Sequence, residues 1–470
     1  MKKLNRLFLA LALVMAVATS RAQEVSPVAF LRMNPYQTNT NVATDLPYYC
    51  YFSVGVGNFG ASIHYPRFRF RDLFNYNSDD SPSTFDLVNF AKGLSDQNSV
   101  ALNLNENIWT FAYRVGDGML SFGHNYRAQA SSEFGYSLFK LLVYGNESLL
   151  GEDNATQVNF SFDGQAYNEY AVGYQLKINK HISVGARAKL LFGIANVTTD
   201  AFDLSFFTDP DTYALHIRED IGMRFSLPRL FELTDDGLTA GGPFGLADFY
   251  HNPGLGFDLG INYRINNRFS VAAAVNDLGF IKWNQNNMEL VGKINDAGQF
   301  YDDDTFVFEG LDVDQLQLIV SDASYRRMFL DTLKEYFNFQ LDETGGYRTS
   351  LPTSFLVRGS IDVNEHNRFS AQFQGCFRSD GFQPAVTLAY GGSFFDKIEV
   401  SGTYTMMKGS LVNVGVGLGF NLGAFHIYGA TSNLFNINTG GSKWRDIQAG
   451  IVFNLREKSD KIGTTTPDYF

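Results

Sequence analysis

Polar and charged side chains alternate with apolar ones along many stretches of the 470-residue chain. This period of two is typical of β-strands whose two faces meet different surroundings. In a strand that spans a bilayer, a charge facing mid-lipid would cost about 2–4 kcal/mol, so charged residues should face the interior. The pattern predicts a set of interior-facing residues that could contact a ligand, namely Lys177, Arg187, Lys189, Arg264, Arg358, Asp362, Gln372, Gln374 and Glu399.

This interior-facing set is mainly basic, which leaves two interpretations open. The basic side chains could form a patch that attracts anionic head groups or holds an acidic plug. They could also be ordinary charges of a water-filled interior, paired with Asp362 and Glu399. The second interpretation is the simpler one.

The sequence contains no pattern that indicates catalysis or a cofactor. None of the seven His residues has H-E-x-x-H spacing, and no G-x-S-x-G motif is present. The run Asp302-Asp303-Asp304 offers oxygen ligands, but no Glu follows at calcium-loop spacing, so a solvated loop is the better interpretation. Cys50 and Cys376 are too far apart in sequence to indicate a disulfide framework. We expect no enzyme activity, metal site, cofactor or disulfide.

The elements that must position these residues are clearest between Asp396 and Leu422. Every second residue from Ile398 to Tyr404 lies on one side, and after a short polar break the even-numbered residues from Val412 to Leu422 form an unbroken apolar face. The opposite face is small and polar. Two such strands joined by a short turn make a hairpin that suits a wall between lipid and a wet interior.

Composition supports a barrel built from such hairpins. Phe and Tyr number 44 and 24, whereas Pro numbers only 12. Aromatic residues favour strands and membrane interfaces. The mean hydropathy is −0.13, and after the N-terminus no apolar run is long enough for a membrane-spanning helix. We therefore predict an all-β chain that forms a transmembrane antiparallel β-barrel.

The alternation predicts about 14 strands, joined by short turns and longer loops in regular order. The short turns lie around Asp117, Asn179, Asn266, Asn364, Asp396 and Gly423. With both ends of the barrel on the short-turn side, the numbers of turns and loops agree, as outer-membrane insertion requires. A further strand pair within residues 192–227 would raise the count to 16. The predicted strands are Tyr49–Val56, Trp109–Val115, Met119–Arg127, Tyr170–Ile178, Ile182–Leu190, Leu255–Ile265, Phe269–Val275, Phe355–Val363, Phe369–Phe377, Val386–Gly391, Ile398–Thr405, Val412–Leu422, Phe425–Thr431 and Trp444–Leu455.

The rest of the chain divides into four parts. Residues 1–22 resemble a secretory signal peptide, because basic residues precede a short apolar run that ends in a small-x-small site. Residues 23–47 are irregular and would lie in the periplasm or plug the barrel of residues 48–455. Residues 311–339 have helical periodicity and predict an extracellular loop helix, either a lid or partner-binding element or a helix packed on the barrel mouth. Residues 456–470 form a polar tail.

The charge balance bears on the partners. Loss of residues 1–22 would remove four basic side chains and take the formal charge from −12 to −16. So acidic a chain is not expected to bind nucleic acid.

The pattern as a whole resembles the FadL-like outer-membrane barrels, and it is similar to uncharacterised outer-membrane barrels of the Bacteroidota. The strings that carry the resemblance are Leu102–Asn105 before Trp109–Arg114, Ala188–Ala195 and Val275–Trp283. The resemblance implies a Gram-negative outer-membrane location, contact with its lipid and insertion by the barrel-assembly machinery. In FadL relatives it also implies an N-terminal hatch with an Asn-Pro-Ala motif. Here Asn34 and Pro35 are the plug candidates, and Tyr36 follows them.

Two functions follow from this reasoning. The first is passive transfer of a small hydrophobic or amphipathic compound, as the FadL resemblance implies. The alternative is a structural or secretion-associated barrel, as in the similar PorV type, that binds protein partners through its loops. The first predicts an apolar pocket behind a plug, and the second predicts a lumen filled by side chains.

Overall fold

The computed structural model describes residues 26–456 except for a number of gaps. The gaps are residues 65–73, 76–83, 86–93, 95–97, 138–155, 159, 209, 212–214, 229–230, 235–236, 241–250, 293–317, 319–321, 323, 326–327, 329–338, 379–380, 396, 408–409 and 435–443. The predicted signal peptide, the polar tail after residue 456 and the Asp302–Asp304 run lie outside the described residues.

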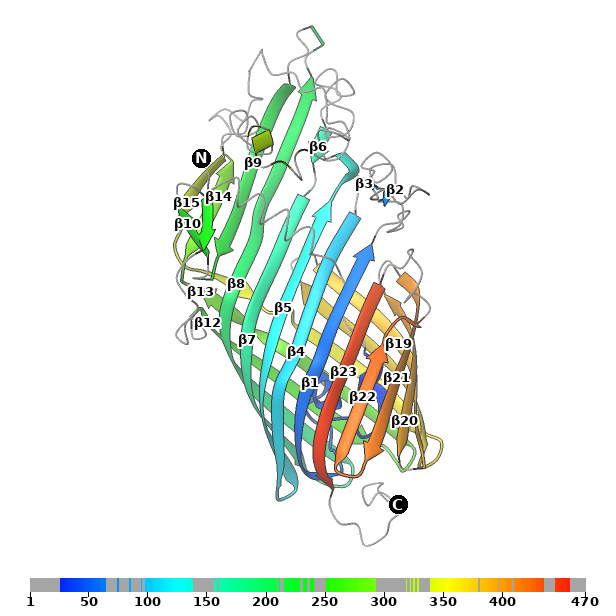
Figure 1. Cartoon of the computed structure of the whole chain (residues 1–470). Coiled ribbons are helices and arrows are strands. Elements are labelled where there is room, and N and C mark those ends of the chain that lie inside the picture. The colour runs from blue at the N-terminus through cyan, green and yellow to red at the C-terminus, as the bar shows by residue number, and fades with distance from the viewer. Residues whose placement is uncertain are drawn as a thin grey trace.

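The described strands form a closed antiparallel barrel of 14 strands (Figure 1). The predicted fold class and strand number are therefore confirmed. In order around the wall, the barrel strands are β1 (Tyr48–His64), β4 (Asn98–Val115), β5 (Gly118–Phe134), β7 (Phe160–Lys177), β8 (Ile182–Thr208), β12 (Pro253–Arg264), β13 (Phe269–Trp283), β17 (Ser354–Asp362), β18 (Asn367–Arg378), β19 (Gly381–Phe394), β20 (Ile398–Met407), β21 (Ser410–Leu422), β22 (Phe425–Thr431) and β23 (Trp444–Arg456).

The first and last barrel strands close the wall. β1 pairs with β23 from Tyr48 opposite Arg456 to Ser62 opposite Trp444, and its other edge pairs with β4. Closure leaves no free edge at membrane level, so the backbone groups of the wall are hydrogen-bonded between strands.

The two faces of each strand differ as the alternation predicted. In β12, Leu255, Phe257 and Leu259 are about half exposed on the outside, whereas Gly256 and Asp258 between them are buried on the inside. In β21 the inner face is made of Asn413, Asn421 and the glycines between them. The outer surface is thus apolar, and the inner surface is small or polar.

Short turns connect the strands at one end of the barrel, at the bottom of Figure 1. In three of them one Asn side chain fixes the turn. The Oδ1 atoms of Asn179, Asn266 and Asn364 each accept hydrogen bonds of 2.7–2.9 Å from the backbone N–H groups two and three residues further on. Such Asx turns explain why the sequence repeats Asn at these positions.

At the opposite end, several strands extend beyond the wall (Figure 1). β8 continues into a hairpin with β9 (Leu215–Ser226), and β9 pairs with β14 (Asn287–Gly292), which pairs with β15 (Phe339–Glu343). The suspected pair within residues 192–227 therefore exists, but β9 joins this extension and does not widen the barrel. Smaller elements are β2 (Phe74–Asn75), β3 (Thr84–Phe85), β6 (Thr156–Val158), β10 (Phe231–Thr234), β11 (Gly237–Ala240) and β16 (Tyr347–Ser350).

Most of the predicted loop helix at residues 311–339 lies outside the described residues. Leu318, Ser324, Tyr325 and Met328 are helical, and Asp322 accepts hydrogen bonds from the N–H groups of Ser324 and Tyr325. The predicted end was wrong, because Phe339 already belongs to β15. In the part of the chain that is described, no helix is long and apolar enough to span a membrane. Cys50 and Cys376 do not form a disulfide.

Candidate functional site in the barrel lumen

Residues 26–47, called the N-terminal segment below, lie inside the barrel, where Figure 1 shows them in dark blue behind the front strands. They form the 3₁₀ turn η1 (Pro27–Phe30) and the short helix α2 (Gln37–Thr40). Ser26 begins η1 because its hydroxyl accepts the N–H of Val28 at 3.0 Å and a proline follows it. Asn34 is fully buried, and its Oδ1 accepts the N–H of Tyr36 at 2.8 Å.

Wall side chains on opposite sides of the barrel hold this segment by its backbone carbonyls. At the start of the segment, Ser401 of β20 donates to the carbonyl of Pro27 at 2.7 Å. Near its end, Ser183 of β8 donates to the carbonyl of Ala43 at 2.9 Å. β8 and β20 are nearly opposite in the closed strand order. The segment therefore crosses the lumen.

Glycines in the wall allow the segment to approach closely. A Cβ atom at Gly185 of β8 would lie 2.6 Å from the backbone carbon and oxygen of Val42. A Cβ atom at Gly391 of β19 would meet the carbonyl oxygen of Phe30. Because backbone atoms cannot rotate away as a flexible side chain can, these positions require glycine while the segment stays in place.

Next to the segment, six charged side chains form a buried cluster on five neighbouring strands, called the ionic cluster. Three are basic and three are acidic, so their formal charges cancel. Lys189 lies at the centre, with its Nζ 2.6 Å from Asp277 Oδ1, 2.7 Å from Asp258 Oδ1 and 3.6 Å from Glu169 Oε2. The members are Arg127, Glu169, Arg187, Lys189, Asp258 and Asp277.

A bulge in β13 brings one of these carboxylates into the cluster. The pairing of β12 with β13 shifts between Phe257 and Leu259, so that Asp258 faces two residues of the other strand. Asp277 has a positive φ of 58°, and its N–H donates to Asp258 Oδ1 at 2.8 Å. The extra residue thus turns Asp277 towards Lys189 and Arg127.

The ionic cluster also holds the N-terminal segment. Arg187 lies 3.4 Å from Asp258 and donates from its other Nη atom to the carbonyl of Thr38 at 2.9 Å. Removing one partner of a buried ion pair usually costs about 3–5 kcal/mol, because the other charge is left uncompensated. We infer that the cluster fixes both the position of α2 and the part of the wall formed by β5, β7, β8, β12 and β13, written β5–β13 below.

Cavities lie on both sides of the segment. One, of about 610 Å³, lies at the loop end between β5, β7, β8 and β16, and is called the loop-side cavity. A second, of about 150 Å³, shares Gln129, Pro352 and Arg378 with the first and reaches Tyr36 and Asn39; it is called the middle cavity. The third, of about 220 Å³, lies between the segment and the short turns and is called the turn-side cavity.

All nine predicted site residues face the interior of the barrel. The structure brings Arg187 and Lys189 together in the ionic cluster. It also links Arg358, Gln372 and Gln374 through hydrogen bonds of 2.7 Å from Arg358 Nε to Gln372 Oε1 and from Gln372 Nε2 to Gln374 Oε1. Arg264 and Lys177 both line the turn-side cavity.

The carboxylates of Asp362 and Glu399 contact residues outside the predicted set. Asp362 pairs with Arg368 at 2.8 Å and with Arg32 at 3.6 Å, and Glu399 accepts the N–H of Met33 at 2.9 Å. Lys177 lies 3.9 Å from Asp45. Lys177 therefore has a partner that is distant in sequence, and Asp362 and Glu399 both contact the N-terminal segment.

Four cluster members were missed by the sequence reasoning: Arg127, Glu169, Asp258 and Asp277. The alternation could have found Glu169 and Asp258, because each occupies a position that the alternation of a predicted strand directs towards the interior. Asp277 could not be found this way, because the bulge breaks the alternation. The plug candidates Asn34 and Pro35 are both buried within the N-terminal segment. Among the described residues, no group of three or more His, Cys, Asp or Glu side chains is arranged to hold a metal ion.

Comparison with known families identifies the chain. A model of the family of unknown function DUF5723 matches residues 43–432. The chain belongs to this family. No curated protein matches the sequence of this DUF5723 member.

Solved structures similar to this DUF5723 chain include two hydrocarbon channels and a FadL homologue. The Pseudomonas putida toluene transporter TodX is 10% identical, over 93% of this chain and 96% of that one, with a TM-score of 0.40. The CymD monoaromatic hydrocarbon channel is 9% identical, over 93% and 98%, with a TM-score of 0.41. A Pseudomonas aeruginosa FadL homologue is 10% identical, over 93% and 98%, with a TM-score of 0.39.

Proposed function

We propose that this protein lies in the outer membrane and passively transfers a small amphipathic or hydrophobic compound through its lumen. In this proposal the N-terminal segment is the plug, and Asn34 and Pro35 belong to it. The observation that carries the proposal is the pair of cavity systems, one on each side of a segment that crosses the lumen. Movement of the segment would join them.

The proposed location is supported by the outer surface. Apolar side chains cover the outside of the strands, and rings such as Tyr49 and Tyr113, with centroids 5.5 Å apart, pack near the short-turn end. Aromatic residues at the ends of an apolar band are typical of barrels in outer membranes. Signal-peptide cleavage before residue 23 belongs to the same proposal.

The lining of the cavities favours an amphipathic compound over a pure hydrocarbon. The loop-side cavity has apolar groups from Leu351, Pro352 and Phe377, but also the charged side chains of Arg348 and Arg378. A binding site usually combines apolar walls with a few polar groups that fix orientation. The apolar pocket that simple hydrocarbon transfer would predict is therefore replaced by a mixed one.

A disulfide that locks the segment tests the proposal. The amide of Asn41 donates from Nδ2 to Asn262 Oδ1 at 2.7 Å, so this pair joins segment and wall by their side chains. We would introduce Asn41→Cys and Asn262→Cys after replacing Cys50 and Cys376 by Ser. Uptake of a fluorophore-labelled octanoate would be measured in Gram-negative cells that produce the variant, with cells carrying an empty vector for comparison.

We expect uptake to stop when the disulfide is formed and to return on reduction, whereas either single-Cys variant should take up the probe under both conditions. Gel mobility of the folded protein would verify the disulfide. Equal uptake with the locked and reduced pair would refute the role of the segment as a plug. Uptake no faster than in empty-vector cells would refute the transfer proposal itself.

A protein-binding scaffold is the second candidate function, and the extension beyond the wall favours it. β9 and β14 carry Ile221, Met223, Phe225 and Leu290, which are buried together with Phe162 of β7. This extension has a hydrophobic core of its own, so it could present a rigid surface to a partner protein. Purification from the native membrane in mild detergent would support this candidate if one protein remained bound in equal amount. A barrel that purifies alone would oppose it.

A further inference from the structure

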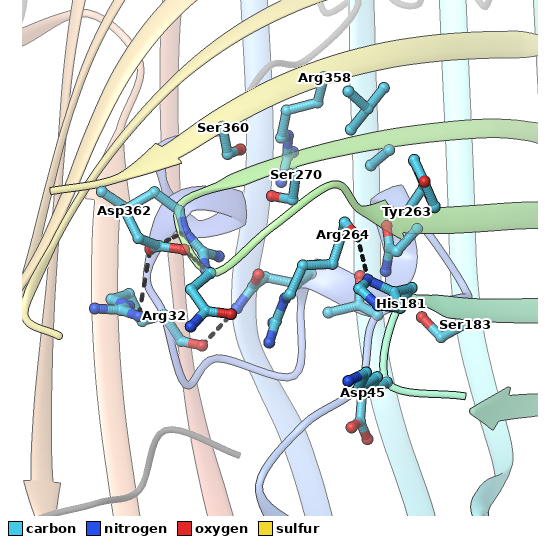
Figure 2. Close-up of a pocket in the computed structure, with 18 of the residues that line it drawn as sticks. Arg32, Asp45, His181, Ser183, Tyr263, Arg264, Ser270, Arg358, Ser360 and Asp362 are labelled. Carbon is cyan, nitrogen blue, oxygen red and sulfur yellow. Dashed lines mark hydrogen bonds and ion pairs between the residues drawn. The ribbon is translucent and has the colours of Figure 1, made fainter. Parts of the chain in front are cut away.

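We propose that the turn-side cavity is a binding site for a small oxyanion, a carboxylate- or phosphate-bearing group, with Arg358 as its direct ligand. Figure 2 shows this cavity, with Arg358 and Ser360 from β17, Ser270 from β13 and Arg32 from the N-terminal segment around it. The proposal does not depend on the transfer of a compound, because it concerns binding at equilibrium.

The charge of the cavity is opposite to that of the chain. Six Lys or Arg residues line it against three Asp or Glu residues, whereas the whole chain has 37 basic and 49 acidic residues. An acidic protein that gathers basic side chains in one concave place attracts anions there. The basic residues are Arg32, Lys177, Lys180, Arg264, Arg358 and Arg368, and the acidic residues are Asp45, Asp362 and Glu365.

Two of the three acidic residues of the cavity, Asp362 and Asp45, are already shared between cations. Asp362 accepts hydrogen bonds from Arg368 at 2.8 and 2.9 Å and forms an ion pair with Arg32 at 3.6 Å. Asp45 lies 3.2 Å from Arg114 and 3.9 Å from Lys177. Each of these two carboxylates thus serves two cations, and a positive charge remains on either side of the cavity. The pKa of the Arg32 guanidinium is lowered mainly by burial and, to a smaller extent, by the positive charge of the neighbouring Arg368. Such a shift is expected where cations lie close together.

Arg358 is the group that requires an acceptor. Its Nε donates to Gln372 at 2.7 Å, its Nη1 donates to the carbonyl of Ala29 at 3.4 Å, and its guanidinium lies 4.5 Å above the ring of Phe30. None of these partners is charged. Its Nη2 atom is buried and has no hydrogen-bond partner among the described residues. A buried guanidinium N–H without an acceptor is costly, and an oxyanion satisfies it best.

The cavity has room and hydroxyl donors for such a ligand. Its volume of about 220 Å³ is well above the roughly 10–15 Å³ that a cavity needs to hold one water. Ser270 of β13 lies opposite Ser360 of β17, and Ser360 is two residues after Arg358, on the same inner face of β17. Both serines line the cavity. A guanidinium beside hydroxyl groups recognises carboxylate or phosphate oxygens, not apolar groups.

Isothermal titration calorimetry on the full barrel in detergent tests the proposal. The probes are inorganic phosphate, acetate and the water-soluble lipid dihexanoyl phosphatidic acid, so that a free anion and a lipid head group are distinguished. The variant is Arg358→Gln. The matched control is Arg268→Gln, because Arg268 is exposed in the turn between β12 and β13 and does not line the cavity.

We expect saturable binding of at least one probe, weakened at least about tenfold by R358Q and unchanged by R268Q, since a charge-assisted hydrogen bond is lost. If R358Q fails to fold, Arg368→Gln replaces it, and binding should weaken severalfold because the cavity loses one positive charge. The proposal would be overturned if none of the probes bound. It would also be overturned if R268Q weakened the binding of a probe as much as R358Q, or its replacement Arg368→Gln, did.

Discussion

Replacing Lys189 by Met removes the central cation of the ionic cluster while keeping a side chain of similar length. The Lys189 side chain is 1% exposed, and its Nζ lies 2.6–3.6 Å from three carboxylates. The cluster has three cations and three anions, so the substitution leaves one uncompensated negative charge inside the wall. By the usual cost of breaking a buried ion pair, we expect K189M to lower the free energy of unfolding by about 3–5 kcal/mol.

A second substitution separates this charge effect from lost packing. Asp258→Asn in the K189M background restores neutrality, and the Asn Oδ1 atom can still accept the N–H of Asp277. The double variant should therefore recover more than half of the loss, giving a coupling energy well above the few tenths of a kcal/mol seen between independent sites. The control is Lys397→Met in the exposed turn between β19 and β20, which should stay within about 0.5 kcal/mol of the unchanged protein.

The assay is urea unfolding of the barrel in lipid bilayers, followed by tryptophan fluorescence. A loss of less than about 1 kcal/mol in K189M would show that water in the lumen screens the cluster. A double variant no more stable than K189M would show that the loss came from packing and not from charge. Either result would refute the view that charge balance holds the wall of β5–β13 together.

Two further predictions concern the N-terminal segment and the outer surface. Gly185→Ala should force Val42 away from the wall, so that the barrel in a planar bilayer shows conducting events more often than the unchanged protein. The control is Gly359→Ala, whose Cβ would meet no atom within 4 Å and which should conduct as the unchanged protein does. Equal conductance of the two variants would contradict the tight seating of the segment. Leu190→Arg on the lipid face should cost about 2–4 kcal/mol in the same urea assay, and Ile178→Arg beside the short turns at most about 1 kcal/mol, because the cost depends on depth. Similar losses for both would contradict the assigned membrane level.

The barrel could be predicted from sequence because each strand reports its own environment. The alternation in β12 and β21 depends only on lipid outside and a polar lumen inside, so local periodicity was sufficient. The turns were equally local, since each of Asn179, Asn266 and Asn364 fixes its own turn. Strand lengths were less predictable. β4 begins at Asn98, well before the predicted Trp109, because hydrogen bonding continues beyond the membrane where apolar alternation is no longer required.

The candidate site was predicted only in part, because its contacts join residues far apart in sequence. Alternation could say that Arg187 and Lys189 face inwards, but not that Lys189 meets Asp277 across two strand pairings. That contact depends on the bulge in β13, and nothing in the period of two marks a bulge. Likewise, the composition of residues 23–47 gave no sign that Arg32 would reach Asp362 on the wall. Pairing partners follow from register and closure, which act over the whole chain.

The contacts of the lumen indicate which part moves if the barrel opens. The wall of β5–β13 is joined by backbone pairing and by the ionic cluster, whose rupture would leave buried charges uncompensated. Residues 38–43 of the N-terminal segment are held by hydrogen bonds to the carbonyls of Thr38, Thr40 and Ala43. Each is worth about 0.5–1.5 kcal/mol for a neutral donor and about 1.5–3 kcal/mol for the charged Arg187, and water in the lumen can replace them. Release of residues 38–43 could therefore proceed stepwise, while deformation of the wall could not. For this reason we expect opening to displace the segment and to leave the barrel, with Arg187 still paired to Asp258, unchanged.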